Sequence, residues 1–342
     1  MTESFLHLSA DERLKAFEHA TKASGQEGRL LEKDIWVVWA IRELFAASFG
    51  EHLVFKGGTS LSKGYGAIRR FSEDVDLTYD IRTIIPDMVG DRENALPPTR
   101  SQGEKWSRAV RTRLPKWIAD SVVPVLGEAL ERDGLSADAN LRVDEDKVFI
   151  DYTPLTKGSG YVKPSVVLEF GARSTGDPFQ RRNIVCDIAE HLEGFELPEA
   201  APRIMLIERT CWEKALAIHV YCLKECSRNE RFARHWYDLA RLDVGGYVDA
   251  ALQDNELAAK VVQHQGFFFI EKDIKGERIN YEAAISGGLV LVPGGAAFDA
   301  LKKDYRLMVE NGFLQNDNDL EPFEDIMDRC REIEKKANCR DV

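Results

Sequence analysis

The spacing of apolar residues changes along the chain and predicts two kinds of secondary structure. Ser9 and Glu12 form a capping box ahead of apolar residues at helical spacing, and a second helix is expected from about 31 to 47. Residues 53–55 are apolar and β-prone, and a glycine pair ends them. From 74 to 79 apolar and polar residues alternate, which is typical of a strand with two different faces.

Further along, the pattern becomes mostly helical. Residues 81–101 and 171–182 have the composition of loops, and 102–133 has a helical pattern in which Pro115 predicts a kink or a boundary. The runs 148–150 and 166–168 are strand candidates. The later expected elements are a β-like piece at 289–293 and amphipathic helices at 204–226, 229–242, 296–311 and 321–337. The chain therefore predicts an α/β fold with a small mixed sheet in an N-terminal domain, 1–200, and a mostly helical C-terminal domain, 201–342.

Composition places the chain among water-soluble globular proteins. Of its 342 residues 44% are hydrophobic and 30% are charged, and no apolar run approaches the ~20 residues that span a bilayer. The first residues lack the features of a signal peptide, so we predict a cytoplasmic protein without a membrane partner. His219, Cys222 and Cys226 share one face of an expected helix, and this grouping favours core packing over a zinc site, which normally needs four ligands.

The net charge of −12 argues against a long nucleic-acid duplex as partner, because each phosphate contact needs a cation. A small nucleotide, or an RNA end held in a local basic cleft, is still allowed. The basic tract, defined as Lys105, Arg108, Arg111, Arg113 and Lys116, is a candidate for RNA contact, with Arg69 and Arg70 as further candidates. A solvated helix face explains the same tract equally well.

Asp74 and Asp76 are the strongest candidates for chemistry. On a strand, residues i and i+2 point to the same face, so the two carboxylates would lie side by side while Val75 faces the core. Two close carboxylates repel unless a cation or a proton separates them. Magnesium needs only one or two carboxylates because it keeps waters and substrate phosphates. A solvent-facing strand edge is the alternative interpretation.

The segment before these acids adds a second signal. Gly57, Gly58, Thr59 and Ser60 follow a strand and begin a helix. Glycines let the backbone approach a phosphate, and free amides at a helix start attract anions. An ordinary strand–turn–helix corner has the same pattern, but its combination with a following Asp-x-Asp is more specific than either motif alone.

Together these motifs resemble the AbiEii/AbiGii family of nucleotidyltransferase toxins from type IV toxin–antitoxin and abortive-infection systems, which act in antiviral defence. Phe55-Lys-Gly-Gly-Thr-Ser-Leu-Ser-Lys63 and Arg70-Phe-Ser-Glu-Asp-Val-Asp-Leu77 are similar to the family signature. Further similarity lies in Glu32-Lys-Asp-Ile-Trp-Val37, Tyr161-Val-Lys-Pro-Ser-Val-Val-Leu-Glu169, Glu213-Lys-Ala-Leu-Ala217 and Arg234-His-Trp-Tyr-Asp-Leu239. His235 stands where the family has the first of two acids.

The resemblance implies a polymerase-β-like nucleotidyltransferase fold and a role for each matching residue. Asp74, Asp76 and Glu169 would hold Mg²⁺ as the cofactor, and the turn formed by Gly57, Gly58, Thr59 and Ser60 would contact the phosphates of an NTP. Lys214 would neutralise the triphosphate, and Asp238 would support the lysine or orient a substrate. The implied reaction transfers a nucleoside monophosphate to an acceptor, the tRNA 3′ end, and so blocks translation. The implied partners are the NTP, the tRNA or another RNA acceptor, and a cognate antitoxin protein.

Two other functions fit the residues. One is a nucleotidyltransferase that acts on a small molecule such as an aminoglycoside, which uses the same glycine turn and paired acids. The other is a non-catalytic protein that binds an NTP or an antitoxin. Retention of all three acids argues against this second alternative, and a basic RNA cleft would argue against the first.

Overall fold

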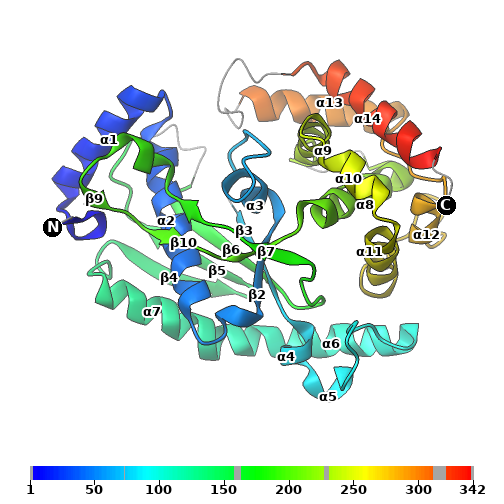
Figure 1. Ribbon diagram of the computed structural model, residues 1–342, viewed down its shortest axis with the longest axis horizontal. Coiled ribbons are helices and arrows are strands. Elements are labelled where there is room, and N and C mark those ends of the chain that lie inside the picture. The colour runs from blue at the N-terminus through cyan, green and yellow to red at the C-terminus, as the bar shows by residue number, and fades with distance from the viewer. Residues whose placement is uncertain (1–2, 73, 158–162, 227–230, 311–320, 340–342) are drawn as a thin grey trace. The chain divides into compact units, whose positions relative to one another are not determined.

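In the computed structural model, the chain forms two compact units that interleave along the sequence (Figure 1). The first unit comprises Met1–Gly64, Ser72–Asp91 and Arg108–Met205, and the second comprises Tyr65–Phe71, Arg92–Ser107 and Leu206–Val342. The structure describes residues 3–72, 74–157, 163–226, 231–310 and 321–339. Glu73, Tyr161 and Val162 of the family-like motifs lie outside these residues. The domain limits of 1–200 and 201–342 stay a prediction.

A seven-stranded mixed sheet forms the centre of the first unit. Strands β3 and β6 pair in parallel, as do β2 and β11, and the other neighbours are antiparallel. The strands in spatial order are β4 (Ala139–Asp144), β5 (Lys147–Tyr152), β6 (Ser165–Gly171), β3 (Asp74–Tyr79), β2 (Leu53–Lys56), β11 (Arg203–Met205) and β7 (Phe179–Arg181). Two short pairs accompany the sheet: β1 (Glu3–Ser4) with β9 (Phe195–Glu196), and β8 (Ile184–Val185) with β10 (Glu199–Ala200).

The two faces of the sheet differ in polarity, as the alternation in the sequence predicts. Val75, Leu77 and Tyr79 point to one face, and the aligned residues of β5 and β6 on that face are also apolar and buried. Trp117 stacks on Tyr79 with ring centroids 3.9 Å apart. Trp36 of α2 (Gly28–Ala46) stacks on Tyr152 at 5.4 Å. The aromatic side chains thus cover the apolar face and leave the opposite face to the polar residues.

Helices complete the first unit. Helix α6 (Arg100–Trp117), of which Arg100–Ser107 belong to the second unit, runs through Pro115, and a π-helical turn, Ile118–Val122, leads into α7 (Val123–Arg132). Pro115 has no N–H to donate to the carbonyl of Arg111, but the helical backbone continues through it into the π-helical turn and α7, so Pro115 is not a helix boundary. The capping box of Ser9 and Glu12 is confirmed at the start of α1. The remaining helices are α1 (Ala10–Ser24), α3 (Gly57–Lys63), α4 (Ile81–Ile84) and α5 (Pro86–Val89).

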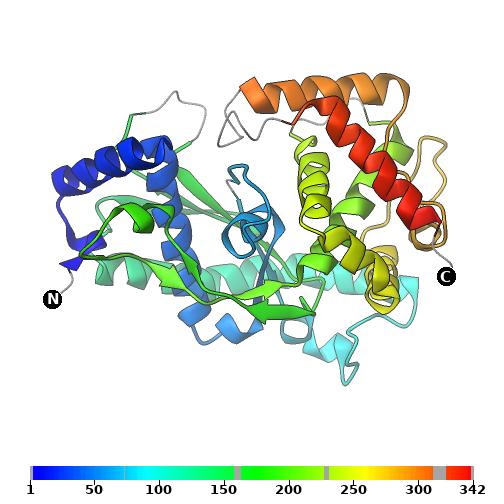
Figure 2. The same ribbon diagram turned by 45° about the horizontal axis from the view of Figure 1, so that its top comes forward.

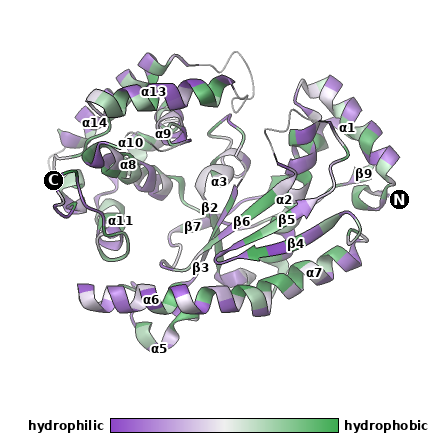
Figure 3. Cartoon of the chain, turned by 180° about the vertical axis from the view of Figure 1, so that it is seen from behind, coloured by the Kyte–Doolittle hydropathy of each residue, from purple (hydrophilic) through white to green (hydrophobic). Residues whose placement is uncertain are grey.

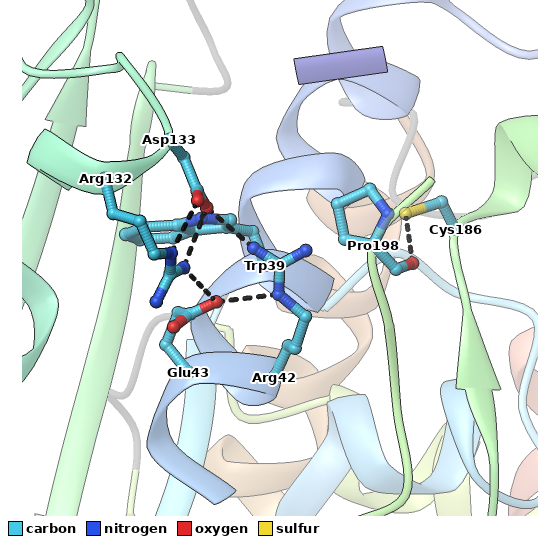
Figure 4. Close-up of polar contacts among 7 residues, drawn as sticks. All are labelled: Trp39, Arg42, Glu43, Arg132, Asp133, Cys186 and Pro198. Carbon is cyan, nitrogen blue, oxygen red and sulfur yellow. Dashed lines mark hydrogen bonds and ion pairs between the residues drawn. The ribbon is translucent and has the colours of Figure 1, made fainter. Parts of the chain in front are cut away.

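A polar network joins α2 to the end of α7 (Figure 4). Asp133 accepts hydrogen bonds from the Trp39 indole at 2.8 Å and from Arg42 at 2.7 Å. Arg132 contacts Glu43 at 2.9 Å and Asp133 at 2.8 Å. Because every charge in the network has an opposite partner, the two helices are fixed to each other without an isolated charge between them.

The second unit is helical. Helices α9, α10 and α11 pack against α8, and α14 packs along α9, as the turned view shows (Figure 2). Green and purple bands alternate along α13 and α14, which is the amphipathic pattern expected from the sequence (Figure 3). The bounds are α8 (Ile207–Lys224), α9 (Arg234–Val244), α10 (Tyr247–Gln253), α11 (Asn255–Phe268), α12 (Tyr281–Ile285), α13 (Gly295–Glu310) and α14 (Phe323–Asn338).

The α/β class with a mixed sheet and a mostly helical C-terminal part is confirmed, but three local predictions were wrong. The expected loop 81–101 contains α4 and α5, and the expected loop 171–182 contains β7. The β-like piece 289–293 is not a strand, because side chains take the place of a neighbouring strand: the amides of Leu289 and Leu291 donate to Asn338 and Glu334. No helix among the residues that the structure describes is long and apolar enough to cross a membrane.

Candidate active site

The three candidate acids lie on one face of the sheet, opposite the apolar face. Asp74 and Asp76 are two residues apart on β3, so their side chains project to the same side. Glu169 on the neighbouring strand β6 is the direct register partner of Asp76. Parallel pairing of β3 and β6 therefore gathers three carboxylates from distant parts of the sequence.

The glycine turn packs directly against one of these acids. Gly57 has a φ of +75°, a conformation that favours glycine. A Cβ added at Gly57 would lie 1.9 Å from Oδ2 of Asp76, so the carboxylate occupies the space that a side chain would fill. The first glycine of the motif is thus needed to make room for the acid itself.

The hydroxyl groups of Thr59 and Ser60 in this turn form hydrogen bonds within the protein. Thr59 donates to the backbone carbonyl of Asp74 at 2.5 Å, and Ser60 donates to the carbonyl of Gly57 at 2.9 Å. Gly58, Thr59 and Ser60 are all buried, and Ser60 is 0% exposed. These contacts tie the turn to β3. Phosphate binding by Gly57, Gly58, Thr59 and Ser60 stays a prediction.

Replacing Gly57 by Ala should displace the Asp76 carboxylate. We expect nucleotidyl transfer to fall roughly 10²-fold, because a shift of about 1 Å in a reacting group is that costly. The free energy of unfolding should fall by about 1–2 kcal/mol from backbone strain. Transfer rates and urea unfolding of the same preparation measure both effects.

Gly134→Ala is the matched control, because Gly134 also has a positive φ of +69° but no atom lies within 4 Å of an added Cβ. It should show the strain without the loss of transfer. Equal activity losses in the two variants would contradict the role of Gly57 in placing Asp76.

Glu169 has a partner that the sequence analysis did not identify. Lys147, the first residue of β5, is the register partner of Glu169 and forms an ion pair with its carboxylate. The hydrogen bond to Glu169 raises the pKa of Lys147, and burial opposes the shift only in part. The amino group also lies in the field of Asp74. The acidic face therefore carries its own cation.

Carboxylate oxygens are suitable ligands for Mg²⁺, and Asp74 and Asp76 supply the one or two acids that such an ion needs. Among the residues that the structure describes, no group of three or more His, Cys, Asp or Glu side chains is arranged to hold a metal ion. In this arrangement Glu169 contacts Lys147. Metal binding by Asp74, Asp76 and Glu169 stays a prediction.

The second unit contains a buried ionic cluster built on Asp238. Asp238 is 0% exposed and accepts two hydrogen bonds from Arg70, from Nε at 2.6 Å and from Nη2 at 2.7 Å. Lys214 contacts the same carboxylate at 2.7 Å. Asp238 therefore contacts the lysine directly, and the roles of Lys214 and Asp238 in the reaction stay predictions.

Mutual contacts keep this cluster charged. Burial by itself would raise the pKa of Asp238, but Arg70 and Lys214 outweigh burial and hold that pKa well below its usual range. Burial lowers the pKa of Lys214, and Asp238 opposes that shift. Lys214 is therefore not a solvated helix lysine, and Arg70 is not available on the surface for RNA, which corrects the expectation for Arg70.

The segment Glu32-Lys33-Asp34 also proves to be buried. Glu32 accepts hydrogen bonds from the amides of Leu155 and Thr156 at 2.7 and 3.0 Å. Asp34 accepts from the amide of Asp187 at 2.6 Å and pairs with Lys63. These acidic residues therefore hold segments of the first unit together around the end of α3, which indicates a structural role.

His219 and Cys222 lie in the core of the second unit, as the sequence favours, whereas Cys226 is only half-buried. Nδ1 of His219 accepts a hydrogen bond from the amide of Val290 at 3.0 Å. Burial lowers the pKa of His219 to about 4, and the hydrogen bond with Val290 opposes the shift only in part. The imidazole is therefore neutral at pH 7.

This histidine predicts a loss of stability in acid. Because its folded pKa lies below its unfolded value, the unfolded chain binds the extra proton, and stability falls as the pH drops from about 6.5 towards 4. We expect a loss of roughly 2–3 kcal/mol from this one group. Urea unfolding at several pH values measures the slope.

His219→Asn keeps an acceptor near Val290 and cannot titrate in this range. Between pH 4 and 6.5, the slope of the unfolding free energy against pH should fall in this variant by the amount that corresponds to about one bound proton. A slope identical to that of the wild type would contradict the assignment.

Comparison with known families agrees with the motifs. Residues 39–329 match the family model described as "Nucleotidyl transferase AbiEii toxin, Type IV TA system". The chain belongs to the AbiEii family. It is therefore a nucleotidyltransferase toxin of a type IV toxin–antitoxin system, with an NTP as substrate and an antitoxin as partner.

A solved structure also matches this AbiEii protein over its length. MenT4, a nucleotidyltransferase toxin from Mycobacterium tuberculosis H37Rv, is 18% identical, with a TM-score of 0.39 and coverage of 96% of this chain and 98% of MenT4. No curated protein matches the chain.

One AbiEii motif differs in this chain, where His235 replaces an acid. The Nδ1 atom of His235 is buried and has no hydrogen-bond partner among the described residues. Burial, with Lys214 and Arg234 nearby, holds the pKa of His235 well below its usual value. A neutral histidine beside two cations avoids the repulsion that a charged one would cause.

Proposed function

We propose that this AbiEii protein transfers a nucleoside monophosphate from an NTP to the 3′ end of a tRNA and thereby blocks translation, with Asp74, Asp76 and Glu169 as the acids that serve the reaction. The observation that carries the proposal is the placement of these acids on one face of adjacent strands, with Gly57 against Asp76. Pyrophosphate is the second product.

Each part of the chain has a role in this proposal. Asp74, Asp76 and Glu169 hold Mg²⁺, which when bound stabilises charge on the phosphate during an in-line displacement. Glu169 helps to activate the attacking hydroxyl group, and the backbone of the Gly57–Ser60 turn contacts the phosphates. Lys214, held by Asp238, neutralises the triphosphate. Positioning and electrostatics supply most of the rate enhancement.

The test is incubation of the purified protein with each labelled NTP in turn, Mg²⁺ and total RNA, followed by separation of the products. Label at the 3′ end of tRNA, together with released pyrophosphate, is the expected result. Label on a small hydroxylated acceptor such as an aminoglycoside, with none on RNA, would replace the tRNA proposal. No transfer to any acceptor would support a binding protein instead.

The acceptor site is proposed to include the basic tract. Lys105, Arg108 and Arg111 are exposed, and no ion pair involving them is found in the described part of the chain. Arg113 and Lys116, in contrast, pair with Asp87 and Asp120. The exposed, unpaired cations are the ones that can meet RNA phosphates in a protein that is acidic as a whole.

Reversing Arg108 and Arg111 to Glu should raise the apparent KM for RNA and weaken its salt dependence. The slope of log K against log salt should fall by about 0.7–0.9 for every phosphate that the variant no longer neutralises. Lys260→Glu with Lys335→Glu changes the net charge equally on exposed helix surfaces and is the control. If both double variants behave alike, the tract is only a solvated helix face.

A further inference from the structure

A row of charged residues crosses four neighbouring strands on the acidic face. Lys56 of β2 pairs in register with Asp76 of β3, Asp76 with Glu169 of β6, and Glu169 with Lys147 of β5. Register partners point to the same side of a sheet. In register order the row is therefore Lys56, Asp76, Glu169 and Lys147, so that a lysine stands on the strand to each side of the two acids.

Lys147 is the better defined of the two cations. Its amino group forms an ion pair and hydrogen bond with Oε1 of Glu169, and Asp74 and Asp146 act on the same group electrostatically. The side chains of Lys147 and Glu169 are 39% and 35% exposed. The pair is thus accessible from solvent and lies on the face that carries the acids.

The ion pair of Lys147 with Glu169 contributes little to the stability of the fold. An exposed cross-strand ion pair contributes only about 0.2–1 kcal/mol. The same charge has a larger effect on a divalent ion, because the Coulomb energy doubles with the charge of the ion. Even with the dielectric constant of water, a unit charge roughly 6 Å from a divalent ion changes its affinity about tenfold.

We propose that Lys147 is a positioning residue, which holds Glu169 in the row and, as a fixed positive charge, lowers the affinity of the acids for a divalent metal in the absence of nucleotide. The inference rests on the proposed function, since it takes Asp74, Asp76 and Glu169 as the metal-binding acids. The positive charge of Lys147 repels a divalent cation that approaches the three acids. The contact with Glu169 keeps this charge beside them.

The experiment measures binding of Mn²⁺ alone to the full-length protein by electron paramagnetic resonance, without nucleotide. Lys147→Met should bind Mn²⁺ about tenfold more tightly than the wild type. Lys147→Arg keeps the charge and should stay close to the wild type. Lys260→Met, which removes an exposed lysine of α11 that pairs with Glu256, should also leave the affinity unchanged. Circular dichroism and thermal unfolding check that each variant is folded.

A double-mutant cycle with Glu169→Gln separates a specific effect from a general change of net charge. In the Glu169→Gln background, Lys147→Met should no longer give its full gain, because the lysine is then no longer fixed beside the acids. The same Mn²⁺ affinity for wild type and Lys147→Met would overturn this inference. Mn²⁺ binding that Asp76→Asn leaves unchanged would instead count against the proposed metal site, and the two failures are therefore distinguishable.

Discussion

Asp76→Asn should abolish nucleotidyl transfer while the protein remains folded. Asp76 lies between Asp74, two residues away on the same strand, and Glu169 on the next strand. Its loss removes a central negative charge from the site proposed to bind the metal, and we expect a fall in transfer of at least roughly 10²–10³-fold. The free energy of unfolding should change by less than about 1 kcal/mol or rise, because removing one of several close carboxylates relieves their repulsion.

Asp120→Asn is the matched control, because Asp120 is exposed in the π-helical turn and pairs only with Lys116 among the described residues. It makes the same chemical change away from the acidic face and should keep full activity. Full activity in Asp76→Asn would exclude the proposed mechanism. Loss of activity together with loss of folding would leave Asp74→Asn as the second variant to measure.

The largest loss of stability is expected for Asp238→Ala. Asp238 is fully buried and is the common partner of Arg70 and Lys214, whose side chains are 4% and 8% exposed. Its removal leaves two buried cations without their carboxylate, which should cost about 3–5 kcal/mol of unfolding free energy. Urea unfolding of the wild type and the variant gives this value directly.

Lys214→Met separates the two roles of the same cluster. Arg70 still makes two hydrogen bonds to Asp238 in this variant, so the carboxylate keeps a charged partner. The loss of stability should therefore be clearly smaller than in Asp238→Ala, whereas NTP use should fall if Lys214 neutralises the triphosphate. Equal destabilisation by the two changes would show that Arg70 alone does not satisfy Asp238.

The sequence predicted the two faces of β3 because alternation is a local property. Val75 in the core and Asp74 and Asp76 on the other side follow directly from it. The contact of Glu169 with Lys147 depends on strand register, which distant parts of the chain decide together. A single sequence holds no direct signal for that register, and Lys147 was therefore missed.

Buried polar residues were the least predictable part of the site. Arg70 looked like a surface residue because its partner Asp238 lies 168 positions further along the chain. Ser60 is predicted to be a phosphate ligand because it follows two glycines, and its hydrogen bond to the carbonyl of Gly57 was not predicted. In both cases the sequence shows the polar side chain, but its hydrogen-bond partner can be identified only in the folded structure.

Because the two units interleave along the sequence, the helical unit is neither synthesised nor encoded as one continuous segment. Arg70 belongs to the helical unit although it is synthesised before most of the sheet, and Asp238 follows much later. A ribosome must therefore deliver most of the chain before this ion pair can form, and the helical unit cannot finish folding as a late, separate module. For the same reason a gene segment encoding only 206–342 would lack Arg70, so recombination cannot exchange the helical unit as a single cassette.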